Sequence, residues 1–420
     1  MRIALPNLQR YNRDTRLIFG ITVIYSVAFF GINMLIKRLF LLRLGHPTSF
    51  LSLFNAIAAF AYMATGLPAG AIGRRIGPRP LLWIGVVATL VGFGLLPLAC
   101  GTTVTTQKAL LLGGQVFLAV GWSIINVSLM TSLAVTSDDT SRASAYAMYN
   151  ALMGLGTLLG NLVGGVLPSF FAWATGQPEA APVNYAWTLF VAFCLVLLTI
   201  PPLLRIGPMR LQEQDAAEGD PVDRSKPPRL RIAMLGLMVM LTQGSVVSLS
   251  SFGSAYMDSE LLMSAAVIGA ILALGKLFGV GASLVSPRLM RMMGAGRVVV
   301  VSSLLLTISV LPVALVPHWS SATLSMLIYL VTISLWSPAA VTYEMDWISA
   351  DWRSLMSGTH AMSMGMIHSL LNLGVSGVID DMGHIPIFAI SGGLSLLGTL
   401  LAFAIQRVRA RGMAGQGIPS

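Results

Sequence analysis

One lysine lies inside an apolar segment, where an uncompensated charge is costly. Lys276 stands about fourteen residues from the start of the apolar run 262–286, too deep for its ammonium to reach either interface easily if that run crosses a bilayer. No Asp or Glu lies three or four residues away from it. Such a cation usually faces a polar cavity, so we predict that Lys276 lines one, where water or an anion could balance its charge. The alternative is a lysine that extends to an interface or bonds to a carbonyl at a helix end.

Two histidines in the segment 354–378 are candidates for proton transfer near neutral pH. His360 and His368 are eight residues apart, which places them about 80° apart on an ideal helix, on one broad face. The acidic residues are expected in loops, Glu344 among them, which leaves these histidines as the candidates inside apolar segments that titrate near neutral pH. The alternative is a packed histidine bonded to a neighbouring hydroxyl or amide.

Sequence signals of enzymes and metal sites are absent. The sequence contains no GxSxG, HExxH or phosphate-loop pattern. Its two cysteines, Cys100 and Cys194, lie in apolar runs without CxxC or His-rich spacing. We therefore predict no enzymatic activity, no cofactor and no metal.

The composition is that of a membrane protein. Hydrophobic residues make up 55% of the 420 residues, charged residues only 10%, and the mean hydropathy is +0.79. Soluble proteins carry about 25% charge. The formal net charge is +10, but the basic residues form short clusters between apolar runs, which argues against nucleic acid and for a lipid bilayer as the partner.

Apolar runs long enough to cross about 30 Å of hydrocarbon predict an all-helical fold with twelve membrane helices. We expect these helices near 17–42, 50–72, 81–101, 109–133, 143–172, 185–204, 231–256, 262–286, 297–316, 320–342, 354–378 and 385–407. Continuous apolar runs of this length exclude the short alternating strands of a membrane β-barrel.

A polar segment divides the chain into two halves. Residues 205–230 are rich in charge, Pro and Gly, which predicts a linker between a six-helix bundle at 1–204 and a second at 231–420. If both termini and the linker share one side, that side holds twenty-one basic residues and the opposite side four. Basic loops stay in the cytoplasm, so we expect cytoplasmic termini in the inner (plasma) membrane.

The two halves carry related connecting loops. The loop after the second predicted helix reads GAIGRRIGPRP at 70–80, and the loop after the eighth reads PRLMRMMGAGR at 287–297. Gly77 pairs with Gly294 and Arg74 with Arg291, both 217 residues apart. Matching loops in two six-helix halves indicate a duplicated transporter architecture of two pseudo-symmetric bundles.

The first of these loops resembles that of the major facilitator superfamily, which has the form G-x-x-x-D-R-x-G-R-R. Gly70, Arg75, Gly77 and Arg79 are in register with it, while Arg74 replaces the family's Asp. The resemblance extends over the whole chain, from helix count to linker. It implies a loop that controls conformational change, formed by Gly70, Arg74, Arg75, Gly77 and Arg79, with Gly294 and Arg297 in the second half.

A glycine stretch in the fifth predicted helix resembles one that is prominent in exporters of the superfamily. Its members are Gly156, Gly160, Gly164 and Gly165, with Asn161 where a Pro is expected. Small residues at every fourth position also allow two membrane helices to pack closely. We favour this packing role over a signature of export.

The resemblance also implies which residues line a cavity. In the superfamily, helices 1, 4, 7 and 10 surround the solute, which makes lining candidates of Asn33, Asn126, Gln243 and Trp336. A basic residue in helix 8 often holds a substrate carboxylate there, the role predicted for Lys276. A helix 1 lysine paired with a helix 8 cation is similar to the arrangement in monocarboxylate transporters, so Lys37 is a further substrate-binding candidate. Its alternative is an anchor at the membrane interface.

The sequence thus predicts secondary active or facilitative transport of a small organic solute by alternating access. An anionic solute is favoured because of Lys276, and protons are candidate coupling ions. We expect a monomer. One alternative is efflux of amphipathic compounds or drugs. An alternative of another class is a membrane receptor or assembly factor that has this fold and transports nothing.

Overall fold

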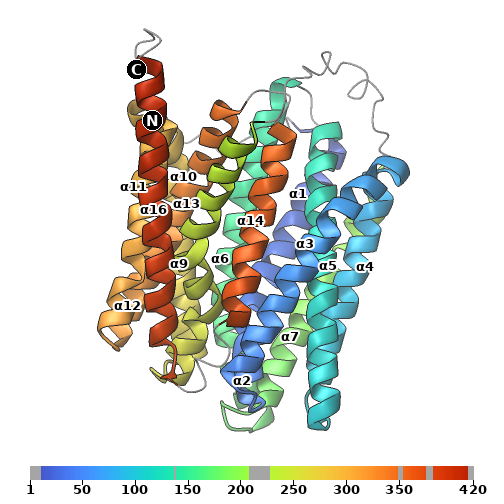
Figure 1. The fold of residues 1–420 in the computed structure, drawn as a ribbon. Helices are drawn as coiled ribbons and strands as arrows, with labels where there is room; N and C mark the ends of the chain where they lie inside the picture. The colour runs from blue at the N-terminus through green and yellow to red at the C-terminus, as the bar shows by residue number, and fades with distance from the viewer. Residues whose placement is uncertain (1–10, 137–138, 208–227, 349–352, 375–381, 415–420) are drawn as a thin grey trace. The chain divides into compact units, whose positions relative to one another are not determined.

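The computed structural model describes residues 11–136, 139–207, 228–348, 353–374 and 382–414 (Figure 1). Every regular element among these residues is helical, which confirms the predicted all-helical fold. The first-half elements are α1 (Arg13–Tyr25), the π-helix η2 (Ser26–Asn33), α2 (Met34–Arg43), α3 (Thr48–Ile76), α4 (Pro78–Leu98), α5 (Val104–Thr136), α6 (Asp139–Thr175), α7 (Pro182–Leu197) and α8 (Ile200–Arg205). The second-half elements are α9 (Arg229–Ser259), α10 (Ala265–Met293), α11 (Ala295–Ser309), α12 (Leu311–Leu315), α13 (Trp319–Trp347), α14 (Arg353–Gly374) and α16 (Ile385–Ala414).

In the described part of the chain, eleven helical stretches are long and apolar enough to cross a membrane. They correspond to the expected helices except the eleventh, which is α14. That helix carries His360, His368, Asn372 and several serines, so its composition is more polar than that of its neighbours.

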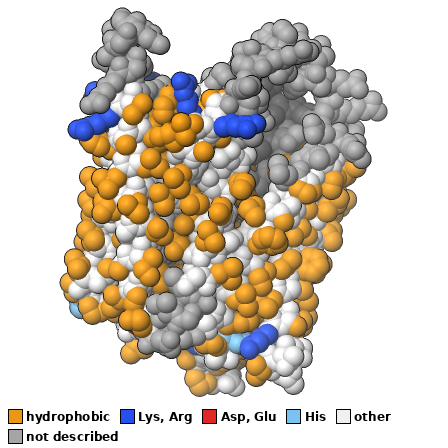
Figure 2. Space-filling model, viewed as in Figure 1, with side chains coloured by type: hydrophobic (Ala, Val, Ile, Leu, Met, Phe, Trp, Pro, Cys, Tyr) orange, Lys and Arg blue, Asp and Glu red, His pale blue; other side chains and the backbone are white. Residues whose placement is uncertain are grey.

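The surface has the character expected of a protein surrounded by lipid. Large side chains such as Phe60, Trp173 and Leu284 are 62%, 80% and 74% exposed. Hydrophobic side chains cover most of the face shown in Figure 2, and the visible Lys and Arg side chains gather near its two ends. A soluble monomer rarely exposes more than a few hundred Å² of contiguous apolar surface.

Contacts divide the chain into two compact units. The N-terminal unit comprises residues 1–44 and 60–219, and the C-terminal unit comprises residues 45–59 and 220–420. The start of α3 thus groups with the second half of the sequence. The predicted linker falls largely outside the described residues, and its limits at 205 and 230 stay a prediction.

Close backbone packing in the N-terminal unit depends on glycine. Gly156, Gly160 and Gly164 of α6 lie against the first helix, where a Cβ on Gly160 would collide with Val27 and Gly31. Gly165 is buried beside them. The first helix is continuous from α1 through η2 to α2, and η2 is the segment with the most extensive contact to α6.

Hydroxyl groups hold the C-terminal unit together between α9 and α16. Ser391 donates to the Ser248 hydroxyl at 2.7 Å, and Ser395 donates to the Thr242 carbonyl oxygen at 3.0 Å. Gly398 lies against the backbone of Thr242. Lipid tails are as apolar as the helix surfaces, so the hydrophobic effect does not drive helices together inside a membrane. Close packing and interhelical hydrogen bonds hold them together instead.

Candidate functional site

The repeated loops have the same backbone geometry. Gly77 is the single residue between α3 and α4, with φ 85° and ψ 163°, and Gly294 is the single residue between α10 and α11, with φ 82° and ψ 146°. Their N–H groups donate to the carbonyls of Gly73 and Met290, both at 2.9 Å. Gly77 and Gly294, which are paired in the sequence, therefore form the same kind of connection between helices.

The basic residues of these loops have different surroundings. Arg79 donates from Nη2 to the carbonyl oxygen of Leu204, near the C-terminal end of α8, at 3.3 Å. Arg297 is exposed at the start of α11. Gly70 lies within α3, and the side chains of Arg74 and Arg75 lie outside the described residues.

Lys276 is half-buried in α10. No described residue forms a hydrogen bond or an ion pair with it. The preceding Gly275 lies against Leu330 of α13, while Leu277 and Phe278 are 51% and 52% exposed on the outer side of the helix. Lys276 therefore lies between the contact of α10 with α13 and an exposed apolar surface. No described acidic residue balances its charge.

Lys37 is buried in α2, with 3% of its surface exposed. Its Nζ donates to the Gln115 side-chain oxygen of α5 at 3.2 Å. The side chain therefore points into the N-terminal unit, which does not fit the alternative of an anchor at the membrane interface, while a role of Lys37 in substrate binding stays a prediction. Burial against a polar partner on another helix removes the ammonium from the surface.

Two amides among the lining candidates are fully buried without partners. Neither the nitrogen nor the oxygen of Asn33 or of Gln243 has a hydrogen-bond partner among the described residues. Asn33 ends η2, one turn before Lys37. Gln243 lies in α9 between Met240 and Val247, which pack with Ile367. A buried unpaired amide costs about 1–3 kcal/mol, so each group is suited to accept a polar ligand.

The other two lining candidates are bonded to protein groups. Asn126 of α5 donates from its amide nitrogen to the Tyr62 hydroxyl at 3.3 Å and is half-buried. Trp336 of α13 is buried and donates from Nε1 to the Ser303 hydroxyl at 3.0 Å. The Trp336 ring lies 6.4 Å from that of His360, centroid to centroid.

The expectation that Glu344 lies in a loop is wrong. Helix α13 continues to Trp347, and Glu344 within it is 0% exposed. Both of its carboxylate oxygens face His360 Nδ1 of α14, at 2.9 and 3.0 Å. A prediction from hydropathy ends a membrane helix at an ionisable residue. Here Glu344 is paired with His360 of α14, and α13 continues past it to Trp347.

The second histidine of α14 has a different environment. His368 Nδ1 bonds to the carbonyl oxygen of Met364 at 2.8 Å, and Asn372 donates to the His368 carbonyl at 2.6 Å. The ring nitrogen Nδ1 is thus bonded within its own helix. The structure therefore brings His360, but not His368, together with a carboxylate among the described residues.

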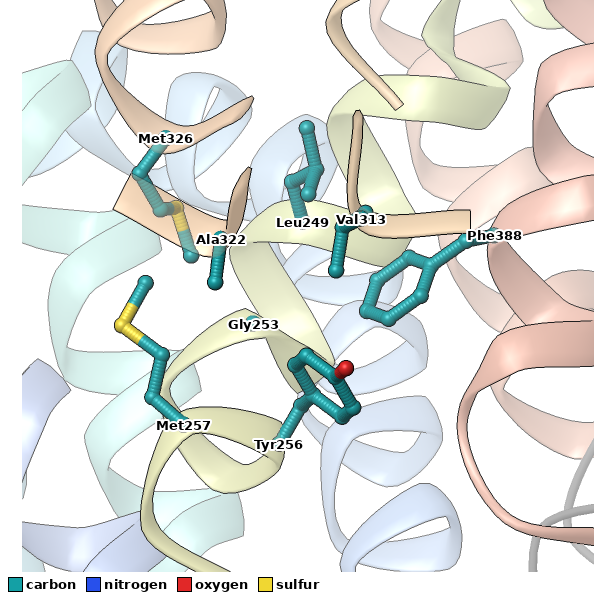
Figure 3. A pocket seen from close by; sticks show the side chains of 8 residues that line it. All are labelled: Leu249, Gly253, Tyr256, Met257, Val313, Ala322, Met326 and Phe388. Atoms are coloured by element: carbon teal, nitrogen blue, oxygen red, sulfur yellow. The ribbon is translucent and has the colours of Figure 1, made fainter. Parts of the chain in front are cut away.

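An apolar pocket lies within the C-terminal unit (Figure 3). It is lined by Leu249, Gly253, Tyr256, Met257, Val313, Ala322, Met326 and Phe388. None of the predicted binding residues lines it. Within the described residues there is no group of three or more His, Cys, Asp or Glu side chains arranged to hold a metal.

Membrane-length helices and a repeated glycine connection define a multi-pass membrane protein of the duplicated transporter class. The chain belongs to the Major Facilitator Superfamily, whose family model matches residues 18–371. This confirms the resemblance predicted from the loop motif and the helix count. It also agrees with the prediction that the protein is not an enzyme.

Two curated relatives match parts of the chain. A glucose/galactose transporter of Brucella abortus biovar 1 (strain 9-941) is 28% identical over 193 residues, which is 46% of each chain. The methyl viologen resistance protein SmvA of Salmonella typhimurium (strain LT2) is 34% identical over 110 residues, 26% of this chain and 21% of that protein. The matched region thus covers about half the length of the glucose/galactose transporter and a smaller part of SmvA.

Solved structures show the same fold over nearly the whole chain. A mutant of the nucleoside transporter NupG superposes with a TM-score of 0.74 at 13% identity, covering 94% of this chain and 99% of that one. The peptide transporter POT in complex with sulfate has a TM-score of 0.73 at 14% identity, with 95% of both chains covered. At these identities the likeness concerns the fold alone.

Proposed function

We propose that this protein is a secondary transporter that moves a small organic anion across the inner (plasma) membrane by alternating access. Lys276 is the observation that carries this proposal. A cation in an apolar helix costs at least a few kcal/mol unless water or an anion compensates it. Because no described residue pairs with Lys276, a solute carboxylate is well suited to supply the missing charge.

The N-terminal unit also contains a lysine inside an apolar helix, Lys37. Lys37 and Asn33 are one helical turn apart, so their side chains share a face of the first helix. Gln115 holds the Lys37 ammonium, and the Asn33 amide has both its donor and its acceptor free among the described residues. We assign these residues to solute binding within their own unit, together with Asn126. Gln243 and Trp336 are assigned to the C-terminal unit.

The experiment begins with the purified chain and a panel of solutes. Carboxylates, sugars, amino acids and cationic drugs are screened for thermal stabilisation, because a ligand that binds the folded state raises the unfolding temperature. Hits are then tested for uptake into proteoliposomes. We expect carboxylates to stabilise the wild type, Lys276→Arg to keep partial uptake and Lys276→Gln to lose most of it.

The matched control is Lys108→Gln, which removes one positive charge from an exposed position. It should leave uptake unchanged. A folded Lys276→Gln variant with wild-type affinity for the carboxylate would show that Lys276 is structural. That result would overturn the anionic assignment.

A neutral sugar is the second candidate solute. The fully buried, unpartnered amides of Asn33 and Gln243 favour it, because an amide offers both a donor and an acceptor to sugar hydroxyls. The glucose/galactose transporter of Brucella abortus provides separate support. Stabilisation by hexoses that survives Lys276→Gln but is lost in Asn33→Leu or Gln243→Leu would select this candidate. Stabilisation by cationic drugs alone would favour efflux, in line with the resistance protein SmvA.

We further propose that the protein is a monomer and that both termini lie in the cytoplasm. The excess of basic residues on the side of the termini and the linker supports the orientation. Single cysteines introduced at Asp220 and Asp380 in a chain without Cys100 and Cys194 should react with an impermeant thiol reagent from opposite sides of the membrane. Labelling of both from the same side would contradict this topology.

A further inference from the structure

We propose that α11 and α16 form a binding site for an anionic phospholipid on the surface of the C-terminal unit. Arg297 of α11 and Arg407 of α16 bind the phosphate of the headgroup, and exposed apolar side chains on the same two helices bind the acyl chains. The site uses none of the residues assigned to solute binding, and its test requires no transport.

The two helices of the site pack against each other in opposite directions (Figure 1). Gly296, at the start of α11, lies against the Gln406 side chain near the end of α16. Further along the pair, the hydroxyl oxygens of Thr307 and Thr399 are 3.1 Å apart. Arg297 follows Gly296 and Arg407 follows Gln406, so each arginine is next to a residue of this contact.

The two arginines project from the same side of the helix pair. One residue along an α-helix turns the side chain by about 100°. Because α11 and α16 run in opposite directions, one step from Gly296 and one step from Gln406 turn toward the same side. Both Arg297 and Arg407 are exposed there. Their guanidinium groups can therefore contact one ligand together.

Apolar side chains continue this side of the pair away from the arginines. Val301 and Leu304 lie one and two turns after Arg297, on its face of α11. Leu400 and Phe403 occupy the equivalent positions before the arginine of α16. These four side chains are between 43% and 56% exposed. The surface thus pairs a positively charged end with an apolar stretch on each helix.

The arginine of α16 is held at the border between the charged and the apolar parts. The guanidinium carbon of Arg407 lies 4.3 Å from the centroid of the Phe403 ring, which is a cation–π contact. The contact fixes the charge directly above apolar surface. Within the described residues, no acidic side chain forms an ion pair with Arg297 or Arg407.

The surrounding helix ends add positive charge and little negative charge. Tyr343 lies against Gly296, which places the end of α13 beside the start of α11. Of the two described acidic residues there, Glu344 is buried against His360 and Asp346 is exposed. Further exposed arginines lie at the start of α9 and the end of α10: Arg229, Arg231, Arg288 and Arg291. Such clusters at the ends of membrane helices attract anionic headgroups.

The chemistry of the surface favours a phospholipid over a water-soluble anion. Guanidinium groups bind phosphate oxygens in a bidentate manner. Gly294 offers no side chain to cap α11, so the first N–H groups of that helix also face the headgroup without a side-chain partner. Inorganic phosphate or an acidic peptide would use these groups but would leave the apolar stretch uncovered. A phospholipid covers both parts.

The test is native mass spectrometry of the purified full chain in detergent. Phosphatidylglycerol and phosphatidylcholine with identical acyl chains are titrated separately, and the apparent Kd of the first bound lipid is measured for each. We expect wild type to prefer phosphatidylglycerol. Each arginine near an anionic headgroup is worth about fivefold in affinity. Arg297→Gln and Arg407→Gln should each lose about that factor for phosphatidylglycerol, and the double variant about twenty-five-fold.

The matched control is Arg16→Gln, which removes an exposed arginine from α1 in the N-terminal unit and should leave the preference unchanged. Arg407→Lys retains the charge but not the planar group on Phe403, so its affinity should lie between those of wild type and Arg407→Gln. The single variants answer the same question if the double variant does not fold.

Three results would overturn the lipid site. The first is equal affinity of wild type for the two lipids, and the second is an unchanged affinity for phosphatidylglycerol in both single glutamine variants. The third is binding of inorganic phosphate or of hexaglutamate as tightly as phosphatidylglycerol, because the apolar stretch then contributes nothing and the arginines bind a soluble anion.

Discussion

Gly77 and Gly294 occupy the same left-handed backbone conformation, 217 residues apart in one chain. Each is the whole connection between two membrane helices, and each donates its N–H to the carbonyl four residues earlier. The geometry explains why glycine is required, since φ near 80° combined with an extended ψ is nearly exclusive to glycine. Both halves of the chain thus turn at this loop by the same means.

Replacing either glycine with alanine should destabilise the protein. Gly77→Ala and Gly294→Ala each force a Cβ into this region, at a cost of about 1–3 kcal/mol. Gly281→Ala is the control, because Gly281 lies inside α10 with open space around it and should become neutral or slightly stabilising. Thermal unfolding in detergent measures the difference. Equal melting temperatures for all three variants would contradict the strained geometry.

The contact of α6 with the first helix should tolerate no side chain. A Cβ on Gly160 would collide with the backbone of Val27 and Gly31, which cannot move like a flexible side chain. We expect Gly160→Ala to lower stability by about 1–3 kcal/mol and Gly160→Leu to prevent folding. Gly20→Ala, at an open position in α1, serves as the control. A folded, monodisperse Gly160→Leu protein would show that this packing is not required.

Hydropathy and loop motifs were sufficient to predict the helices, the duplication and the family. Each helix is predicted from the composition of about twenty residues, so a single atypical residue does not change the prediction. The π-helix η2 carries no comparable signal in the sequence, and its Gly31 packs against the backbone of Gly160 in α6, a tertiary contact that no local pattern encodes. The grouping of residues 45–59 with the C-terminal unit depends in the same way on tertiary contacts.

Individual site residues were harder to predict because their roles depend on partners distant in sequence. The sequence predicts Lys37 as a substrate-binding residue or, alternatively, an interfacial anchor, and it gives no sign of the hydrogen bond to Gln115, 78 residues away. Glu344 looked like a loop residue because its partner His360 lies 16 residues further along. In both cases a charge is tolerated inside the protein by a contact that no local pattern encodes.

The bond between Lys37 and Gln115 should contribute measurably to stability. Unfolding of Lys37→Met, Gln115→Leu and the double variant gives the coupling energy between the two side chains. Interhelical hydrogen bonds in membranes are worth about 0.6–2 kcal/mol, so we expect a coupling in that range. Lys108→Met is the control for loss of a lysine at an exposed position. Strictly additive effects would show that the two groups do not interact.

A second carboxylate–histidine contact predicts how stability depends on pH. Glu260 Oε1 accepts hydrogen bonds from His384, at 3.0 Å from the backbone N–H and 2.5 Å from Nδ1, just before α16 begins. Burial of Glu260 opposes ionisation, but these bonds and the His384 charge outweigh it and hold the pKa of Glu260 below its ordinary value of 4.5.

Because the pKa is lower in the folded state, the ionised carboxylate stabilises folding at pH values above 4.5, and this contribution is lost as the pH falls through the lower folded value. The Glu260 side chain is 34% exposed, so solvent screening limits the effect to about 1 kcal/mol at neutral pH. Melting temperatures of wild type and Glu260→Gln should therefore differ at neutral pH and converge in acid. Glu179→Gln, at an exposed carboxylate, is the control. A gap between wild type and Glu260→Gln that stays constant down to acidic pH would show that the contact is steric and does not depend on the charge of Glu260.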